Sequence, residues 1–178
     1  MATPPFVLLA SARPAGDTAA LVRTMFAHTE HVLHNLLDAP LYPYSYAGHY
    51  PPDDAFAAVA RQLVQHEVVV FATPVYWYAM SGLLKTFFDR LTDLVTVTKP
   101  LGRQLRGKRT FLLAVGEEEI LPLGFEEPFR LTARYLEMEF GGSLYYSKKY
   151  PPTADALAES IQAFLSRLAT PSAPSSNA

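Results

Sequence analysis

The sequence predicts an α/β fold in which an open, doubly wound, five-stranded parallel sheet lies between two layers of helices. Three observations support this. Five short apolar runs recur without strict polar–apolar alternation, helical patterns separate them, and 49% of the 178 residues are hydrophobic while 18% are charged. Such runs suit strands that are covered on both faces, as in parallel sheets. Strands that alternate with helices predict right-handed crossovers.

The five predicted strands are runs rich in branched and aromatic side chains. In chain order they are FVLLA (6–10), VLHNLL (32–37), VVVFA (68–72), TFLLAV (110–115) and FGGSLYY (140–146). The last run is the weakest of the five.

A helix is predicted after each strand, because apolar residues recur there at spacings of three and four. The stripes are Thr18, Leu21, Val22, Met25 and Phe26; Phe56, Val59, Ala60 and Leu63; Leu84, Phe87, Phe88 and Leu91; Phe129, Ala133 and Leu136; and Leu157, Ile161, Phe164 and Leu168. The similar segments YPPDDAF (50–56) and YPPTADAL (150–157) are interpreted as two helix starts, because proline and carboxylates suit a first helical turn.

The chain length predicts a single domain over residues 1–169, since domains commonly have about 100–200 residues. The tail TPSAPSSNA (170–178) has nothing to bury and is expected to be disordered.

The N-terminal segment MATPPFVLLASA lacks the basic region of a signal peptide. No run approaches the roughly 20 apolar residues of a membrane span, so we expect a cytoplasmic protein and no membrane partner.

Charge and cysteine content narrow the function classes. A formal net charge of −2 gives no basic field for nucleic acid or anionic lipid, which favours a small-molecule partner. The absence of cysteine removes disulfides, a thiol nucleophile and cysteine metal sites. Redox chemistry would therefore need a cofactor.

Small and hydroxylated residues follow the first strand in SARPAGDTAAL (11–21). Ligands of open α/β sheets bind at the carboxyl ends of strands. A helix that starts near Asp17 or Thr18 offers free N–H groups and a positive dipole end, and Arg13 can make a forked contact with phosphate. A monophosphate pocket and an ordinary turn with Asp17 as N-cap are about equally supported. The segment matches neither G-x-x-x-x-G-K-[ST] nor G-x-G-x-x-G.

Aromatic residues cluster after the third strand, in VVVFATPVYWYAMSGLLKTFFDRL (68–91). Core aromatics usually recur at the period of a helix or strand, whereas Tyr76, Trp77 and Tyr78 are consecutive in a loop with proline. We interpret this loop as a wall for a flat ring system, held by stacking and by backbone N–H groups. The alternative is that these rings fill the core.

The segment VGEEEILPLGF (115–125) follows the fourth strand. Gly116 permits close approach of the backbone to a ligand, and Gly124 and Phe125 are expected at the pocket edge. A solvated turn is favoured over a metal site at 117–119, because three consecutive side chains point in different directions. The five histidines also lack ligand spacing, so no metal is expected.

Two further segments have two interpretations each. The basic run KPLGRQLRGKR (99–109) is interpreted as a solvated face, and the alternative is a surface that attracts the extra phosphate of NADPH. The tyrosine-rich segment APLYPYSYAGHYPP (39–52) is favoured as a loop that covers hydrophobic surface, and the alternative is an aromatic wall for a ligand or partner subunit.

The first and second loops together resemble those of the NAD(P)H-dependent FMN reductase family, which has a flavodoxin-like fold. The first is similar to the pattern G-S-x-R-x-x-x-N-T at Ser11, Arg13 and Thr18, with Ala10 replacing glycine and Asp17 replacing asparagine. The second loop and its helix resemble P-x-Y-x-x-x-x-S/P-x-x-L-K-x-F-x-D-R, the more specific pattern. It matches at Pro74, Tyr76, Ser81, Leu84, Lys85, Phe87, Asp89 and Arg90.

The resemblance covers about residues 5–168 in element order and implies a strand order of 2-1-3-4-5. It implies FMN as cofactor, NADPH or NADH as co-substrate, and ping-pong hydride transfer to a quinone, azo compound, flavin or similar acceptor. A homodimer is also implied. The implied phosphate-binding residues are Ser11, Arg13, Asp17, Thr18 and Ala19, and the implied ring-binding residues are Pro74, Val75, Tyr76, Trp77 and Gly116.

No side chain is expected to act as a general acid or base, because the flavin carries the chemistry. The backbone N–H of Asp17 is expected to serve the phosphate while its carboxylate caps the helix or points away. Two other classes stay open, a flavodoxin-like electron carrier and a cofactor-free interaction module. A charge of −2 is mild for a carrier that docks with redox partners.

Overall fold

A computed structural model describes residues 3–170 of the chain, so nearly all of the predicted disordered tail lies outside the described residues. A five-stranded sheet with the order β2-β1-β3-β4-β5 forms the centre, and all of its strand pairs are parallel. The strands are β1 (Phe6–Leu9), β2 (Val32–Asn35), β3 (Val68–Pro74), β4 (Arg109–Gly116) and β5 (Glu139–Ser147). This confirms the predicted flavodoxin-like α/β fold and its strand order.

Helices follow each strand, as predicted. They are α1 (Asp17–Met25), α2 (Phe56–Leu63), α3 (Gly82–Arg90), α6 (Glu127–Tyr135) and α7 (Ala154–Ala169). Short helices α4 (Thr92–Thr96), α5 (Lys99–Gly102) and the 3-10 turn η1 (Arg103–Leu105) fill the connection from α3 to β4. The sequence did not reveal these three, because elements of three to five residues are too short to show a helical period.

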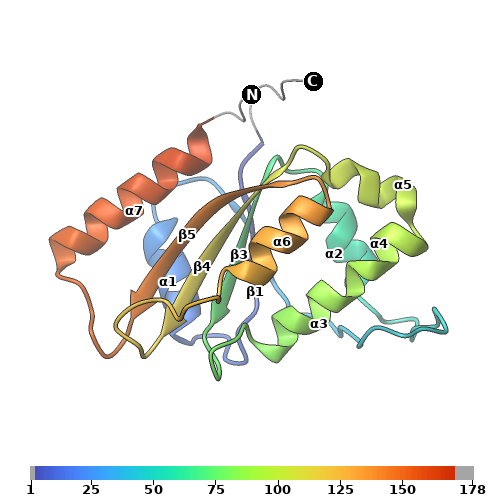
Figure 1. The fold of residues 1–178 in the computed structure, drawn as a ribbon, viewed down its shortest axis with the longest axis horizontal. Helices are drawn as coiled ribbons and strands as arrows, with labels where there is room; N and C mark the ends of the chain where they lie inside the picture. The colour runs from blue at the N-terminus through green and yellow to red at the C-terminus, as the bar shows by residue number, and fades with distance from the viewer. Residues whose placement is uncertain (1–2, 171–178) are drawn as a thin grey trace.

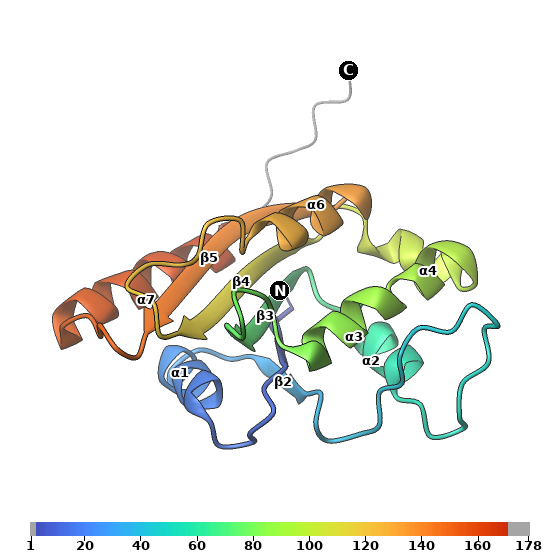
Figure 2. The same cartoon turned by 60° about the horizontal axis from the view of Figure 1, so that its bottom comes forward.

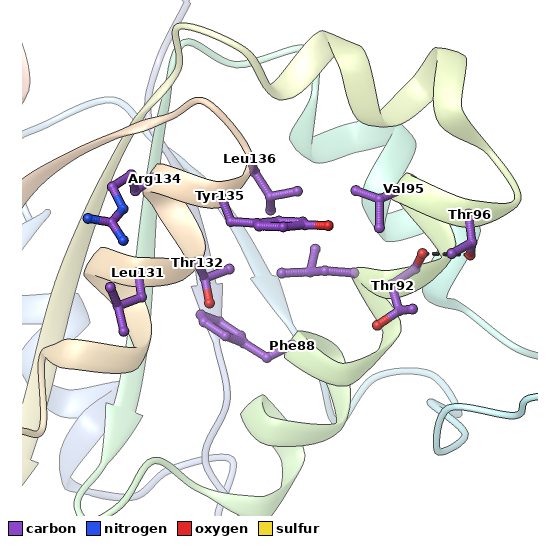
Figure 3. A pocket seen from close by; sticks show the side chains of 10 residues that line it. Phe88, Thr92, Val95, Thr96, Leu131, Thr132, Arg134, Tyr135 and Leu136 are labelled. Atoms are coloured by element: carbon purple, nitrogen blue, oxygen red, sulfur yellow. Dashed lines mark hydrogen bonds between the residues drawn. The ribbon is translucent and has the colours of Figure 1, made fainter.

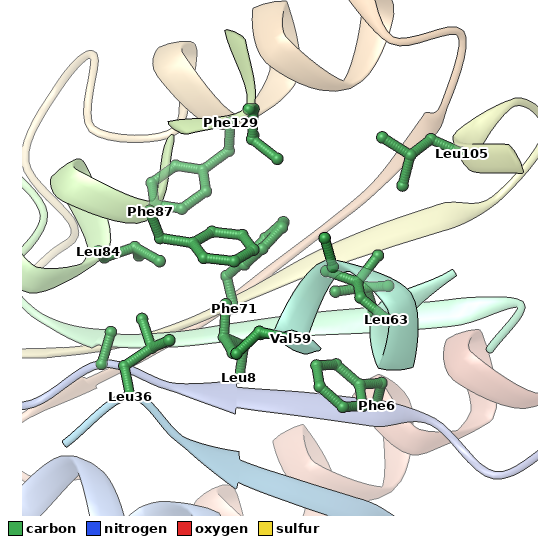
Figure 4. Close-up of a cluster of buried hydrophobic side chains, with 14 of the residues drawn as sticks. Phe6, Leu8, Leu36, Val59, Leu63, Phe71, Leu84, Phe87, Leu105 and Phe129 are labelled. Carbon is green, nitrogen blue, oxygen red and sulfur yellow. The ribbon is translucent and has the colours of Figure 1, made fainter. Parts of the chain in front are cut away.

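The sheet has a helix layer on each face (Figures 1 and 2). Helices α1 and α7 cover one face, where they pack against Val70, Phe111 and Leu113 of the strands. Helices α2, α3, α4 and α6 cover the other. Figure 4 shows the second of these cores, in which Leu8 and Phe87 are fully buried. Complete burial of each such side chain contributes roughly 1.5–3 kcal/mol.

One of the two predicted helix starts lacks the expected acidic residue in its first turn. Thr153 caps α7 by accepting from the Ala156 N–H at 3.3 Å, but α2 has no acidic residue in its first turn. The Asp54 carboxylate binds the Arg90 guanidinium instead, at 2.9 and 2.8 Å. The Asp54 carboxylate therefore lies before the first turn of α2, where it forms a long-range ion pair.

Arg90, the last residue of α3, binds the tyrosine-rich segment through its side chain. Its side chain is 2% exposed and also contacts the Asp93 carboxylate at 2.8 Å and the Tyr42 carbonyl at 3.0 Å. The Tyr50 ring lies over the guanidinium, 3.4 Å from ring centroid to Cζ. Leu41 of the same segment packs against the hydrophobic core, in agreement with the favoured interpretation that the segment covers hydrophobic surface. None of the helices within residues 3–170 is both long and apolar enough to cross a bilayer.

Candidate functional site

The connections that follow β1, β3, β4 and β5 meet at the carboxyl edge of the sheet. The Val75 N–H donates to the Val115 carbonyl at 2.7 Å, and the Lys148 N–H donates to the Gly116 carbonyl at 2.8 Å. These bonds extend the strand pairing and hold the loops side by side. They enclose a pocket of about 160 Å³ lined by Ser11, Arg13, Asp17, Thr18, Pro74, Val75, Tyr76, Val115, Gly116, Glu117 and Lys148.

The turn from β1 into α1 brings backbone close to the pocket. Gly16 is the N-cap, and a Cβ at this position would lie 3.2 Å from the Arg13 Cβ and 3.5 Å from the Ser11 Oγ. The backbone N–H groups of Thr18 and Ala19 have no hydrogen-bond partner within residues 3–170. Free N–H groups at a helix start attract anions. This end of the pocket therefore has the donors that a phosphate requires.

Asp17 begins α1, as predicted, but Gly16 and not Asp17 is the N-cap. The carboxylate instead lies 3.0 Å from the Lys148 Nζ and 3.6 Å from an Arg13 guanidinium nitrogen. The hydrogen bond from Lys148 holds the Asp17 pKa below its ordinary value. The carboxylate is therefore ionised near neutral pH, beside an anion-binding helix start.

Ser81 ties the first two loops together. Its hydroxyl donates to the Ala10 carbonyl at 2.7 Å, and its N–H donates to the Thr73 Oγ1 at 3.0 Å. The same hydroxyl accepts from the Leu84 N–H and so caps α3. A single buried serine thus positions the ends of β1 and β3 relative to each other.

The aromatic loop turns back on itself at Trp77 and Tyr78. The Tyr76 and Ala79 backbones exchange hydrogen bonds of 2.9 and 3.0 Å, and the two central residues have φ of 48° and 62°. Positive φ at both central positions is typical of a type I′ turn, which favours asparagine and glycine. The prediction that these rings do not fill the core is confirmed, because Trp77 is 94% exposed.

Gly116 ends β4 where the backbone is crowded. A Cβ there would lie 2.6 Å from the Tyr145 hydroxyl and 3.2 Å from the Val75 Cβ. The Tyr145 hydroxyl donates to the Glu118 carbonyl at 2.8 Å, which fixes the loop that follows. A larger residue here would have to displace Tyr145, and the expected approach of a ligand to the Gly116 backbone stays a prediction.

The pocket includes every predicted site residue except Ala19 and Trp77. Ala19 faces the core beside β4, although its N–H is at the helix start. Trp77 lies at the exposed tip of the turn. The pocket also contains Glu117 and Lys148, which sequence reasoning missed. The one signal in the sequence was their position, because Glu117 directly follows β4 and Lys148 directly follows β5.

The basic run 99–109 lies away from the pocket. It leads into β4, whose first residue is Arg109, at the opposite edge of the sheet from the carboxyl ends (Figure 1). Arg109 is 8% exposed and donates to the carbonyls of Arg167 and Leu168 at the end of α7. Arg109 is therefore an exception to the predicted solvated face, and within one chain the run is poorly placed for a nucleotide phosphate at this pocket.

Residues 6–151 match the family model described as NADPH-dependent FMN reductase. The chain belongs to this family. It is therefore an NAD(P)H-dependent FMN oxidoreductase, with FMN as cofactor and NAD(P)H as co-substrate.

Two curated relatives are similar to this FMN reductase in sequence, and the first agrees with the assignment by name. A Bacillus subtilis protein named NAD(P)H-dependent FMN-containing oxidoreductase YwqN is 31% identical over 101 residues. That match spans 53% of this chain and 55% of the relative. The potassium-efflux system ancillary protein KefG of an Enterobacter species is 30% identical over 181 residues, 93% of each chain.

Solved structures resemble the FMN reductase over nearly its whole length. The Trp repressor binding protein from Bacillus subtilis has a TM-score of 0.70 and 25% identity, and covers 93% of this chain and 99% of its own. An NADPH-quinone reductase from P. pentosaceus has a TM-score of 0.70 at 15% identity, with coverages of 96% and 100%. The second similarity supports the flavodoxin-like fold alone.

Proposed function

We propose that the pocket at the carboxyl edge binds the phosphate of FMN and that the flavin ring lies against the Tyr76–Tyr78 turn. The main support for this proposal is that the loops after β1, β3 and β4 converge on one pocket. Its volume of about 160 Å³ suits a phosphate better than a whole cofactor, since pockets that enclose drug-sized ligands are about 300–1,000 Å³. The ring would therefore lie at the open mouth.

The residues at the helix start fit a phosphomonoester. Ser11 and Thr18 supply hydroxyls, and the Thr18 and Ala19 N–H groups are free within the described residues. The Arg13 side chain is 71% exposed and reaches the pocket wall, so its guanidinium is free to turn onto an anion. Asp17 contributes its backbone position at the start of α1, while its carboxylate stays with Lys148.

The residues at the mouth fit a planar ring. Pro74, Val75 and Tyr76 form one side, and Gly116 leaves room for backbone approach on the other. Trp77 is held outside the pocket on the turn, where its ring is available for stacking. FMN, when bound, supplies the hydride chemistry, and the surrounding residues bind and orient it.

The proposed electron acceptor is a planar aromatic compound, such as a quinone, an azo compound or a free flavin. Trp77 and Tyr78 are 94% and 65% exposed beside the pocket. Exposed aromatic faces favour planar ligands over bulky or highly charged ones.

Because NAD(P)H is an intracellular reductant, we also propose that the protein acts in the cytoplasm.

The proposed function is tested by purification and NADPH oxidation. The protein is expected to be yellow, to release FMN on denaturation, and to oxidise NADPH when a quinone is added. An Arg13→Ala, Thr18→Ala double variant should lose FMN, because it removes a guanidinium and a hydroxyl from the phosphate pocket. A protein that binds FMN but does not oxidise NADPH would support the electron carrier instead.

We further propose that the protein is a homodimer whose interface includes α6. A groove of about 700 Å³ lies between α6 and helices α3 and α4, and Phe88, Val95, Leu131 and Tyr135 contribute to its wall (Figure 3). Leu131 and Tyr135 are 41% and 74% exposed. Exposed apolar surface of this kind is typical of interaction sites.

Charge complementarity favours a second copy as the partner. Glu118 and Glu119 precede α6 together with Ile120 and Leu123, which are 75% and 106% exposed. Arg134 lies in the groove wall at the other end of α6. Antiparallel α6 helices related by a two-fold axis would place the acidic, apolar loop of each copy on the basic end of the other groove.

The homodimer is tested by sedimentation of the wild type and of an Ile120→Glu, Tyr135→Glu double variant. Two buried carboxylates should convert the dimer to a monomer. Tyr46→Glu is the matched control, because Tyr46 is 96% exposed and lies in the tyrosine-rich segment. A monomeric wild type, or a dimer that survives the double variant, would contradict this interface.

The full-length relatives favour a second candidate function. Several are named ancillary proteins of a glutathione-regulated potassium-efflux system, with coverage of 93% of both chains in the Enterobacter match. The flavin-loaded protein would then also regulate a transport protein. Potassium efflux from vesicles that contain such a system should rise when the protein is added, and an unchanged rate would exclude this role for the system tested.

A further inference from the structure

The pocket wall contains two carboxylates, an unusual feature for a site that must accept an anion. Asp17 begins α1, and Glu117 follows β4. A phosphomonoester carries about −1.5 to −2 charges at neutral pH. Left unpaired, these carboxylates would repel it across a short distance. The chain must therefore offset their charge if the pocket is to bind FMN.

Lys148 contacts both carboxylates. Its Nζ lies 3.0 Å from the Asp17 Oδ2 and 3.1 Å from the Glu117 Oε1. Its backbone N–H donates to the Gly116 carbonyl at 2.8 Å, which fixes the start of the side chain at the pocket. The hydrogen bonds to Asp17 and Glu117 raise the Lys148 pKa, so the ammonium stays charged at neutral pH.

The four charged groups of the pocket wall balance one another. Arg13 and Lys148 are the cations, and Asp17 and Glu117 are the anions. Arg13 is farther from Asp17, at 3.6 Å, and its side chain is more exposed than that of Lys148. Without Lys148, the wall would carry a net negative charge. Arg13 would then be divided between Asp17 and the incoming phosphate.

We infer that Lys148 is a positioning residue that makes the pocket competent for a phosphate by neutralising Asp17 and Glu117. In this role the ammonium acts through the carboxylates and leaves Arg13 free for the ligand. The inference rests on the proposed function, since it concerns the same pocket. It assigns a role to the connection between β5 and α7, an element outside the two loops that the sequence pattern identified.

The test compares the affinities of FMN and riboflavin, which differ in the phosphate alone, by titration of flavin fluorescence. Lys148→Gln should weaken FMN binding by about tenfold or more, the expected scale for loss of an interaction with a charged group. Riboflavin affinity should not change. Lys149→Gln is the matched control, because the Lys149 ammonium is directed to the Tyr150 ring and not to the pocket.

A second variant distinguishes charge neutralisation from direct contact with the phosphate. Adding Asp17→Asn to Lys148→Gln removes the repulsive charge and should restore most of the lost FMN affinity. If Lys148→Gln binds FMN as the wild type does, or if Asp17→Asn gives no recovery, the inference is wrong. A wild type that binds neither flavin would contradict the proposed function instead.

Discussion

Trp77 is a residue whose backbone is strained and whose side chain is hardly packed. Its φ of 48° lies in the left-handed region, next to Tyr78 at 62°. A residue other than glycine has a conformational free energy roughly 1–2 kcal/mol higher in this region. Burial does not offset this cost at Trp77, which is 94% exposed. Strain of this kind is often retained for binding, which supports a role for the turn in holding the ring.

Trp77→Gly should therefore raise stability and lower function. Relief of the left-handed strain, about 1 kcal/mol, corresponds to an increase in Tm of roughly 2–4 °C for a chain of this size. The rate of NADPH oxidation should fall because a stacking surface is lost. Tyr46→Gly is the control, an exposed aromatic residue without positive φ. A lower Tm together with an unchanged rate would mean that the turn is not strained for function.

Gly116→Ala tests the close approach at the end of β4. The new methyl group would lie 2.6 Å from the Tyr145 hydroxyl, so the Tyr145 ring or the strand must move. Overpacking of this kind costs about 1–3 kcal/mol, and FMN binding should weaken as the pocket edge shifts. Thermal unfolding and flavin titration measure both effects. Gly82→Ala, with no atom within 4 Å of the new Cβ, should neither lower the stability nor weaken FMN binding.

At the scale of elements, the pocket depends on how the strand ends are joined. Ser81→Ala removes the α3 cap and leaves the buried Ala10 carbonyl without its side-chain donor. The expected loss is about 1–3 kcal/mol in the free energy of unfolding. FMN affinity should fall as well, since the loops after β1 and β3 lose their common contact. Ser160→Ala on the exposed face of α7 is the control. Equal FMN affinity in both variants would argue against loop positioning by Ser81.

The ion pair between Arg90 and Asp54 joins α3 to the connection between β2 and α2, which includes the tyrosine-rich segment. Burial alone would raise the Asp54 pKa, but hydrogen bonds from Arg90 and the Tyr42 N–H, with the Arg90 charge, lower it. A carboxyl with a lowered native pKa stabilises the fold above its unfolded pKa. That contribution is lost as the pH falls below the ordinary value of 3.8 through the native pKa.

Asp54→Asn should therefore destabilise the protein at neutral pH by about 1–3 kcal/mol, because Arg90 loses one of its two buried carboxylate partners and keeps Asp93. Denaturant unfolding at pH 7 and in the acid range measures the effect, and the difference from wild type should shrink as Asp54 becomes protonated. Asp53→Asn is the neighbouring control, since the Asp53 carboxylate makes an exposed contact with the Tyr42 hydroxyl. Equal destabilisation by both variants would exclude the buried pair as the cause.

For the whole molecule, the sequence predicted the strands and helices that depend on a local pattern of apolar residues. The β3 and β4 strands were recognisable because their apolar runs are buried on both faces. Helix α1 was recognisable because its apolar spacing continues for more than two turns. The pairing of Asp54 with Arg90 was not, because the partners are 36 positions apart and no short pattern links them.

The candidate site was predictable to the same extent. Parallel topology brings the ends of β1, β3 and β4 to one edge, so Thr18, Tyr76 and Gly116 could be grouped before the structure was known. Lys148 could not be distinguished from Lys149, because which side chain faces the pocket depends on where β5 ends. Trp77 was correctly placed in the aromatic loop, but its exposure follows from a turn type that aromatic residues rarely adopt.

The most direct test of the account uses Trp77, the single tryptophan of the chain, as an internal reporter of flavin binding. Its fluorescence is measured while FMN is added to the cofactor-free protein. Saturable quenching is expected in the wild type, and saturation at a much higher FMN concentration is expected in the Arg13→Ala, Thr18→Ala double variant. Tight FMN binding that leaves Trp77 fluorescence unchanged, or that is indifferent to the double substitution, would contradict the account.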